Sequence, residues 1–214
     1  MEGFVKKVLC ITIFLLKVNN LFAYSEPDTW DNKKAKTIEF SINLIMNREK
    51  FVPHCYKDNE GWSAGWGDYH WCNETIQNMR YTNPILKYIS DDILRKKVKI
   101  TQEQARWRLK KFVINVYDKL ETKLDLRLYD EIEITGLIDF IYTIGETRFY
   151  KKTTLFKILK DDNLTFDNKT CIRIRNNFLE WSKMKKDGKY VVAKGVQNRR
   201  HTEYEFFLYK KCVF

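Results

Sequence analysis

The sequence is poor in the residues and patterns that separate domains. Only 3 of its 214 residues are proline, and it contains no low-complexity linker and no internal repeat. These absences exclude a string of flexibly linked modules and a repeat protein, and they favour one compact domain. The three histidines, His54, His70 and His201, are scattered without the spacing of metal ligands. We therefore expect no metal and no other cofactor.

The N-terminal apolar run is too short for a permanent membrane anchor. It covers residues 8–16, whereas a membrane-spanning helix needs about 20 residues. Lys6 and Lys7 precede the run and the small residue Ala23 follows it, which is the pattern of a secretory signal peptide. We predict a signal peptide over residues 1–23 and a secreted or periplasmic protein. A buried first helix and an uncleaved signal that tethers the chain to a membrane are the alternatives.

The remainder of the chain is strongly basic. Residues 24–36 are polar and are expected to form a leader, and residues 37–214 are expected to form the folded domain. Removal of residues 1–23, which hold three lysines and one glutamate, lowers the formal charge from +11 to +9. Such a protein is attracted to polyanions, among them acidic cell-wall polymers. No nucleic-acid-binding motif stands out, so we expect no nucleic-acid partner.

Cysteine usage fits export. Cys10 lies in the predicted signal, which leaves Cys55, Cys72, Cys171 and Cys212 in the mature chain. An even number of cysteines in an exported protein indicates disulfides. Of the three possible pairings we favour the one that joins the first two cysteines to each other and the last two to each other. Four buried thiols in a reducing cytosol are the alternative.

An apolar stripe of helical period ends in a carboxyl group. Ile38, Ile42 and Ile45 step by four and three residues, and Glu49 is the next position on the same helix face. Because an apolar setting favours the protonated form of a carboxyl group, a residue at this place is a candidate general acid.

A second carboxyl group follows in a different setting. Residues 58–61, Asp-Asn-Glu-Gly, are strong turn formers, and we predict that the segments on either side pair as a small hairpin. Asp58 would then be solvated at the turn. Alternation along the second strand puts Ser63 on the face opposite to Trp62 and Trp66.

Two carboxyl groups in such different settings suit the hydrolysis of a glycosidic bond. One group donates a proton to the leaving oxygen and the other handles water. Glu49 and Asp58 are the candidates for these two roles. The alternative is a helix and a hairpin whose acidic residues are ordinary surface charges.

This segment resembles the phage lysozymes, muramidases of glycoside hydrolase family 24, which carry a Glu, an Asp and a Thr before a Gly-x-Gly. Further similarities follow in the family's order over roughly residues 38–210. They lie at residues 100–105 (ITQEQA), 136–145 (GLIDFIYTIG), Phe149, 153–155 (TTL), Trp181 and 195–203 (GVQNRRHTE). Because several motifs recur in order, the resemblance is specific.

The resemblance implies an α+β lysozyme-like fold. It predicts a small β-hairpin lobe, a larger helical lobe that begins near Thr101, and the active-site cleft between them. It also implies inverting hydrolysis of the β-1,4 bond between N-acetylmuramic acid and N-acetylglucosamine in peptidoglycan. Glu49 would protonate the leaving oxygen, and Asp58 with Ser63 would position the attacking water. The expected protein is a monomeric bacteriolytic enzyme whose partner is the glycan strand.

The resemblance adds Arg199 to the site as the contact of Glu49. A neighbouring cation favours the ionised form of a carboxyl group, in opposition to burial, and the sequence leaves the balance open. Without the resemblance, Arg199 and Arg200 would be a solvated helix start, with Glu203 as an i,i+4 partner.

Two further features bear on the site. Residues 136–144 are apolar on nearly every helix face, so Asp139 among them should need a partner. Tyr56, Trp62 and Trp66 offer flat apolar faces that suit sugar rings, although aromatic residues of a small lobe often pack in its core.

The chain also departs from the family pattern. Ser63 replaces the family's Thr, which keeps the hydroxyl but loses the methyl group that fixes the rotamer. After Gly67, residues 68–70 read Asp-Tyr-His where the family has a His. Residues 68–99 form a longer stretch than expected, which could cover one rim of the cleft and alter substrate choice. A non-catalytic peptidoglycan-binding protein and a chitin or chitosan hydrolase are therefore the alternatives.

Overall fold

The computed structural model describes residues 30–58, 61–161, 163–186 and 189–212. The chain divides into one unit that ends at Lys33 and a second that begins at Lys34. The predicted signal peptide lies outside the described residues. Within the described ranges, no helix combines the length and the apolar character that a membrane crossing requires.

The first described helix, α2, covers Trp30–Arg48 and begins earlier than expected. Residues 30–36, for which the sequence predicts a polar leader, are helical. Asp31 in the first turn favours this start, because a negative charge is stabilising at a helix N-terminus. Ile42 and Ile45 are fully buried, which confirms the predicted apolar stripe.

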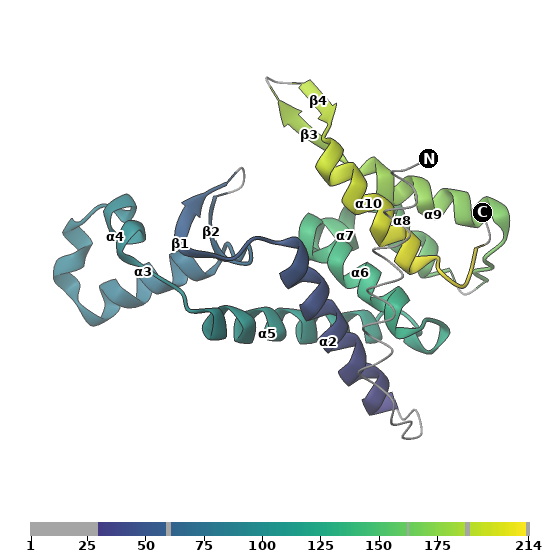
Figure 1. The fold of residues 1–214 in the computed structure, drawn as a ribbon, viewed down its shortest axis with the longest axis horizontal. Coiled ribbons are helices and arrows are strands. Elements are labelled where there is room, and N and C mark those ends of the chain that lie inside the picture. The colour runs from purple at the N-terminus through teal and green to yellow at the C-terminus, as the bar shows by residue number, and fades with distance from the viewer. Residues whose placement is uncertain (1–29, 59–60, 162, 187–188, 213–214) are drawn as a thin grey trace. The chain divides into compact units, whose positions relative to one another are not determined.

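The remaining elements are short strands and helices (Figure 1). The strands are β1 (Val52–Lys57), β2 (Trp62–Gly65), β3 (Lys183–Lys186) and β4 (Lys189–Val192). The α-helices are α3 (Trp71–Thr82), α4 (Asp91–Lys97), α5 (Gln102–Glu121), α6 (Glu131–Ile144), α7 (Glu146–Lys152), α8 (Thr154–Leu159), α9 (Asn168–Glu180) and α10 (Lys194–Phe207). The 3₁₀ helices are η1 (Pro84–Tyr88) and η2 (Leu126–Leu128).

The predicted hairpin is present and belongs to a small lobe, by which we mean β1, β2, α3, η1 and α4. The strands are antiparallel, with Tyr56 opposite Ser63 and Lys57 opposite Trp62. Helix α3 packs against β2 and α4 against β1. A separate core cluster joins the small lobe to the start of α5 and is formed by Cys55, Ala64, Trp66, Cys72, Val98, Ile100 and Ala105.

The helical lobe is built around α6, which is buried on nearly every face, as predicted. A capping box fixes its start: the side chain of Asp130 accepts a hydrogen bond from the Glu133 amide at 2.9 Å, and Glu133 accepts one from the Asp130 amide at 2.7 Å. Helix α5 begins in the same way, with the N-cap Thr101 and its partner Gln104. Both helices therefore start where their sequences specify.

Helix α10 packs closely along α6. Gly136 permits this approach, because a Cβ atom at that position would lie 2.8 Å from the backbone oxygen of Glu203. Only a residue without a side chain fits there. The close packing places polar residues of α10 against the buried helix α6.

A second antiparallel pair, β3 with β4, is not among the sequence predictions. The partners run from Lys183 opposite Val192 to Lys186 opposite Lys189. The two strands read Lys-Met-Lys-Lys and Lys-Tyr-Val-Val, which lack the strict apolar–polar alternation that predicts a half-buried strand, and all four residues of β4 are exposed. The fold is nevertheless α+β as predicted, with mostly helical structure and small antiparallel sheets.

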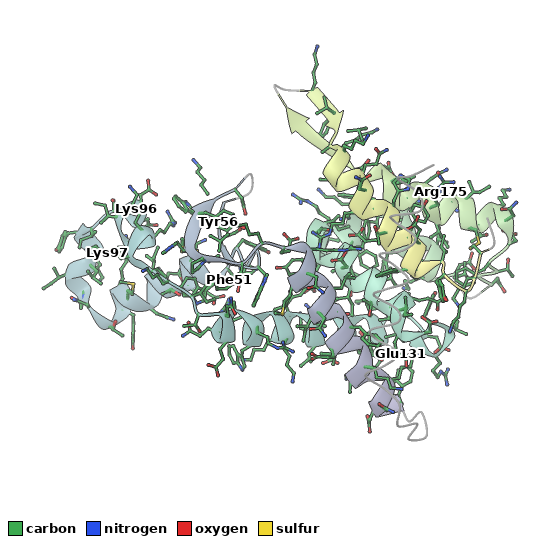
Figure 2. The ribbon with its side chains drawn as sticks, viewed as in Figure 1. Phe51, Tyr56, Lys96, Lys97, Glu131 and Arg175 are labelled. Atoms are coloured by element: carbon green, nitrogen blue, oxygen red, sulfur yellow. A yellow bond between two sulfur atoms is a disulfide. The ribbon has the colours of Figure 1, made fainter. Side chains whose placement is uncertain are left out.

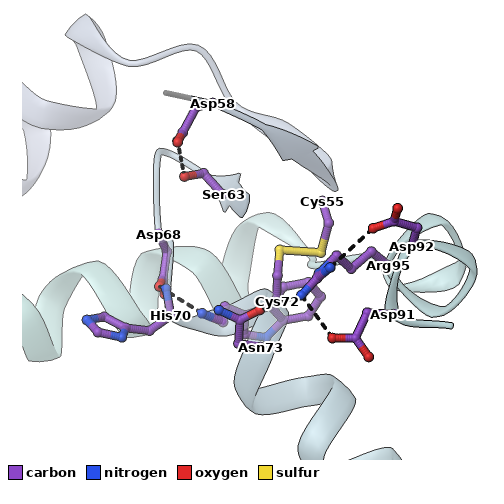
Figure 3. Close-up of a disulfide and its surroundings, with 11 residues drawn as sticks. Cys55, Asp58, Ser63, Asp68, His70, Cys72, Asn73, Asp91, Asp92 and Arg95 are labelled. Atoms are coloured by element: carbon purple, nitrogen blue, oxygen red, sulfur yellow. Dashed lines mark hydrogen bonds and ion pairs between the residues drawn. A yellow bond between two sulfur atoms is a disulfide. The ribbon is translucent and has the colours of Figure 1, made fainter. Parts of the chain in front are cut away.

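Two disulfides connect the pairs favoured from the sequence. Cys55 of β1 is bonded to Cys72 of α3 (Figure 3), with Cα atoms 6.0 Å apart. Cys171 of α9 is bonded to Cys212, with Cα atoms 6.1 Å apart. The first disulfide ties the hairpin to its covering helix, and the second ties the C-terminal segment to α9.

Candidate active site

Glu49 is the first residue after α2. Its amide still donates a hydrogen bond to the carbonyl of Ile45 at 2.9 Å, so the backbone keeps the helical direction and the residue stays on the apolar face. The Glu49 side chain is 30% exposed. The carboxyl group can therefore meet a ligand while the helical lobe holds it.

Arg199 of α10 donates a hydrogen bond to the Glu49 carboxylate, the contact that the resemblance implies. The same guanidinium also lies 3.3 Å from the carboxylate of Glu203, one helical turn along α10. The Glu203 contact of the alternative is thus present, but its solvated helix start is wrong, because the Arg199 side chain is only 15% exposed. Because Arg199 is anchored within its own helix, its contact with Glu49 is fixed in direction.

Asp58 and Ser63 form a second polar pair at the end of the hairpin. The Ser63 hydroxyl donates to one carboxylate oxygen of Asp58 (Figure 3), and the amide of Gly61 donates to the other at 3.0 Å. Ser63 is only 1% exposed, so its hydroxyl has little freedom. The Asp58 carboxylate consequently has a set orientation, which is what a group that positions water requires.

Tyr56 of β1 (Figure 2) lies opposite Ser63 in the hairpin. Burial raises the pKa of its phenol, and the charges of Asp58 and then Glu49 raise it further. The hydrogen bond joins Asp58 to Ser63, and the charge of Glu49 acts on the tyrosine opposite Ser63.

Asp139 is the buried partner of Arg199. Its side chain is fully buried in α6, and its Oδ1 atom accepts a hydrogen bond from Arg199 Nη2 at 2.6 Å. Arg48, the last residue of α2, donates to the other oxygen. Burial raises the pKa of Asp139, but the charges of Arg199 and then Arg48 lower it more, so the net pKa is below its usual value. Asp139 is therefore an ionised group inside the helical lobe.

The second arginine of α10 is also buried. Arg200 donates to Glu203 at 2.8 Å, and the two side chains are 1% and 0% exposed. Burial raises the pKa of Glu203 well above its usual value. For Arg199, burial lowers the pKa but Asp139 and Glu49 raise it more, so the group that touches Glu49 stays cationic.

Three residues of this neighbourhood are missing from the sequence-based site. Asp139 gave a signal, as a charge in an apolar helix, but not its role. Arg48 gave none, because the residue before Glu49 falls on another helix face. Tyr142 gave none either, since a tyrosine in a buried helix resembles any core residue. Its hydroxyl donates to the carbonyl of Trp66 at 2.5 Å, and burial and then the charge of Glu49 raise its pKa.

The candidate sugar-stacking residues differ in their surroundings. Trp66 is 7% exposed and its ring centroid lies 5.0 Å from that of Phe51. The guanidinium of Arg95 covers Trp62 at 4.9 Å. Both tryptophans therefore have packing partners in the small lobe, whereas Tyr56 has both carboxylates among its electrostatic neighbours.

Asp68 organises the chain after Gly67. It accepts hydrogen bonds from the amides of His70 and Trp71 at 2.9 and 3.0 Å and from the side chain of Arg108. These bonds fix the start of α3. The following stretch to Lys99 packs on the hairpin through α3 and α4, and its place at the rim of a cleft stays a prediction.

The histidines occupy scattered places in the described structure. His54 forms an isolated bridge with Lys99, and the His201 ring lies 3.1 Å from the hydroxyl of Tyr204. In the part of the chain that the structure describes, no three His, Cys, Asp or Glu side chains group as a metal site would require.

Comparison with known proteins decides the family. The model of the phage lysozyme family matches residues 46–203, which include the hairpin, α5, α6 and most of α10. The chain belongs to the phage lysozyme family. No curated protein matches this phage lysozyme homologue in a sequence search.

Solved structures support the lysozyme-like fold. The muramidase domain of SpmX from Asticaccaulis excentricus has a TM-score of 0.56 at 15% identity, with 78% of this chain and 94% of that domain covered. The endolysin from Escherichia coli O157:H7 phage FAHEc1 has a TM-score of 0.53 at 21% identity, with 79% and 91% covered. The active form of P1 phage endolysin Lyz has a TM-score of 0.52 at 15% identity, with 81% and 85% covered. These matches confirm the α+β lysozyme-like fold predicted from the sequence.

Proposed function

We propose that this protein is a secreted lysozyme that hydrolyses the β-1,4 bond between N-acetylmuramic acid and N-acetylglucosamine in peptidoglycan. Membership of the phage lysozyme family supports the coarser statement, a glycosidase that acts on peptidoglycan. The finer proposal depends on one observation: each of the two candidate carboxylates is held by its own donor, Glu49 by Arg199 and Asp58 by Ser63.

Glu49 is proposed as the general acid. Arg199 binds its Oε1 atom, so the transferred proton is assigned to Oε2. When the glycosidic bond breaks, this proton moves to the leaving oxygen and the anomeric carbon acquires positive character. The partial exposure of Glu49 supports the role, because a substrate oxygen must reach the proton.

Asp58 is proposed as the base, with Ser63 as its support. Water attacks the anomeric carbon from the face opposite to the leaving group and gives its proton to Asp58, which inverts the configuration. This geometry needs carboxyl groups about 6.5–9.5 Å apart, to leave room for the water. The two donors on Asp58, Ser63 and Gly61, support a fixed direction for that water.

Export is part of the proposal. The N-terminal pattern of two lysines, a short apolar run and a small residue supports a signal peptide. Two disulfides are typical of proteins that fold in an oxidising compartment. The substrate also lies outside the cytoplasm of a bacterial cell, so an exported enzyme could reach it.

The test is release of reducing groups from purified peptidoglycan by the disulfide-bonded protein and by Glu49→Gln. We expect the substitution to reduce the rate by about 10²-fold or more, because a general acid contributes roughly that factor. Glu39→Gln is the matched control, since Glu39 is an exposed carboxylate on the same helix, paired with Arg106. Its activity should equal that of the wild type.

Three results would contradict the proposal. Wild-type activity in folded Glu49→Gln would remove Glu49 from the mechanism. Binding to peptidoglycan without any release of reducing groups would favour a non-catalytic binding protein. Faster hydrolysis of chitin oligomers than of peptidoglycan would assign a different substrate.

A further inference from the structure

Asp139 is a buried charge whose two cationic partners both lead to Glu49. One partner, Arg199, binds the carboxylate of Glu49, and the other, Arg48, precedes Glu49 in the chain. A buried carboxylate is costly unless its partners compensate for the lost water. A change at Asp139 should therefore affect Glu49, the candidate acid. A change in an ion pair elsewhere in the molecule should not.

These contacts close a ring. It runs from Glu49 through Arg199 to Asp139, on to Arg48, and back to Glu49 along one peptide bond. Because α2 ends at Arg48, the ring holds Glu49 where the helix no longer restrains its side chain. Both the backbone and the carboxylate of Glu49 are thus tied to the same buried residue of α6.

The ring also balances charge. Arg199 binds Glu49, and Arg48 is the residue before it in the chain. The negative charge of Asp139 offsets one of these two positive charges. Without Asp139, both positive charges would act on Glu49 and favour its ionised form. The other charged or titratable groups around the ring are Asp58 and Tyr56 of the hairpin, Tyr142 of α6, and Arg200 and Glu203 of α10.

We propose that Asp139 is a positioning residue for Glu49, which anchors Arg199 and Arg48 and limits the positive charge that Glu49 experiences. The inference rests on the proposed function, in which Glu49 must carry a proton when the substrate binds. Asp139 acts on Glu49 through the two arginines and not through a contact with the substrate.

The first test is an NMR titration of the Glu49 side-chain carboxyl carbon in the full, disulfide-bonded protein. In Asp139→Asn we expect the midpoint to fall by roughly one pH unit, because one balancing charge is lost. Glu133→Gln is the matched control: Glu133 is also buried in α6, but it caps the other end of the helix. It should leave the midpoint unchanged.

A double variant separates charge from structure. Arg48→Met combined with Asp139→Asn removes one positive and one negative charge, so the midpoint should return toward the wild-type value. If Asp139→Asn fails to fold, Arg48→Met alone supplies the test with the opposite sign. Removal of one positive charge should then raise the midpoint of Glu49.

Activity gives a second readout. On peptidoglycan we expect Asp139→Asn to lower kcat by about 10- to 100-fold through misplacement of Glu49, and to move the alkaline limb of the pH profile to lower pH. Glu133→Gln should move neither.

An unchanged Glu49 midpoint in folded Asp139→Asn would overturn the inference, as would an equal shift in Glu133→Gln. An unchanged or lower midpoint in Arg48→Met would do the same. The titration needs no substrate, so a wild type without glycosidase activity would contradict the proposed function while the titration still decides the role of Asp139.

Discussion

At the scale of single residues, the candidate site uses largely buried hydrogen-bond donors to orient its carboxylates. Ser63 is a small residue on a strand, and its hydroxyl reaches the Asp58 carboxylate across the hairpin. Arg199 does the same for Glu49 from a neighbouring helix. In each pair the donor side chain is largely buried, so few water molecules compete for the hydrogen bond.

Replacement of Ser63 tests the hydroxyl. Ser63→Ala should lower kcat/KM on peptidoglycan by about 10- to 100-fold, because a hydrogen bond to a charged group contributes roughly 1.5–3 kcal/mol. Ser63→Thr restores the hydroxyl and should retain most of the activity. Thermal denaturation of each variant shows whether it is folded. Wild-type kcat/KM in folded Ser63→Ala would exclude a role for this residue in the reaction.

Sequence reasoning located the residues whose signal is local. Glu49 ends a periodic stripe, Asp58 lies in a strong turn, and Ser63 follows in the paired strand. Arg199 needed the family resemblance, because an arginine pair near a helix start has an ordinary solvated interpretation. The contact of Arg48 with Asp139 joins positions 91 residues apart, and nothing local in the sequence encodes it.

At the scale of elements, the packing of α6 against α10 determines where Arg199 lies. The two helices approach closely at Gly136, where the backbone of Glu203 leaves no space for a side chain. Arg199 is four residues before Glu203 on α10. The distance between the two helices therefore determines where the Arg199 guanidinium, which holds Glu49, lies.

A pair of glycine substitutions tests this packing. Gly136→Ala should lower the free energy of unfolding by about 1–3 kcal/mol, because the added methyl group meets backbone that must shift. Gly195→Ala, on α10 itself, has nothing within 4 Å of the added Cβ atom. It should be neutral or stabilising by up to about 1 kcal/mol, as alanine is the better helix former. Urea denaturation of both variants measures the difference, and equal stabilities would contradict the close approach.

The elements differ in how far the sequence specifies them. The starts of α5 and α6 follow from capping residues, and the first hairpin follows from its turn. The sequence predicts a polar leader over residues 24–36, whereas α2 begins at Trp30, because a polar helix end has the composition of a leader. The β3–β4 hairpin is not predicted because its four-residue strands lack strict apolar–polar alternation.

At the scale of the whole molecule, two disulfides close segments of different length. Cys55 and Cys72 are 17 residues apart, and Cys171 and Cys212 are 41 residues apart. In the chain-entropy account, a disulfide that closes a longer segment removes more freedom from the unfolded chain. The C-terminal disulfide should accordingly contribute more to stability.

Removal of each disulfide by double Cys→Ser substitution tests this order. Loss of the Cys171–Cys212 bond should lower the free energy of unfolding by about 4 kcal/mol, and loss of the Cys55–Cys72 bond by about 3 kcal/mol. Denaturation under oxidising conditions measures both, with the fully reduced wild type as reference. No loss of stability in either variant would contradict a structural role for the bonds.

The central claim is that the protein cleaves peptidoglycan glycan strands at N-acetylmuramic acid. Its most direct test is the identity of the new reducing ends after digestion of purified peptidoglycan and reduction of the products with borohydride. A lysozyme leaves N-acetylmuramic acid at each new reducing end, so we expect N-acetylmuramitol, and none above background with Glu49→Gln. Reduced N-acetylglucosamine as the product, or no new reducing ends from folded wild-type protein, would contradict it.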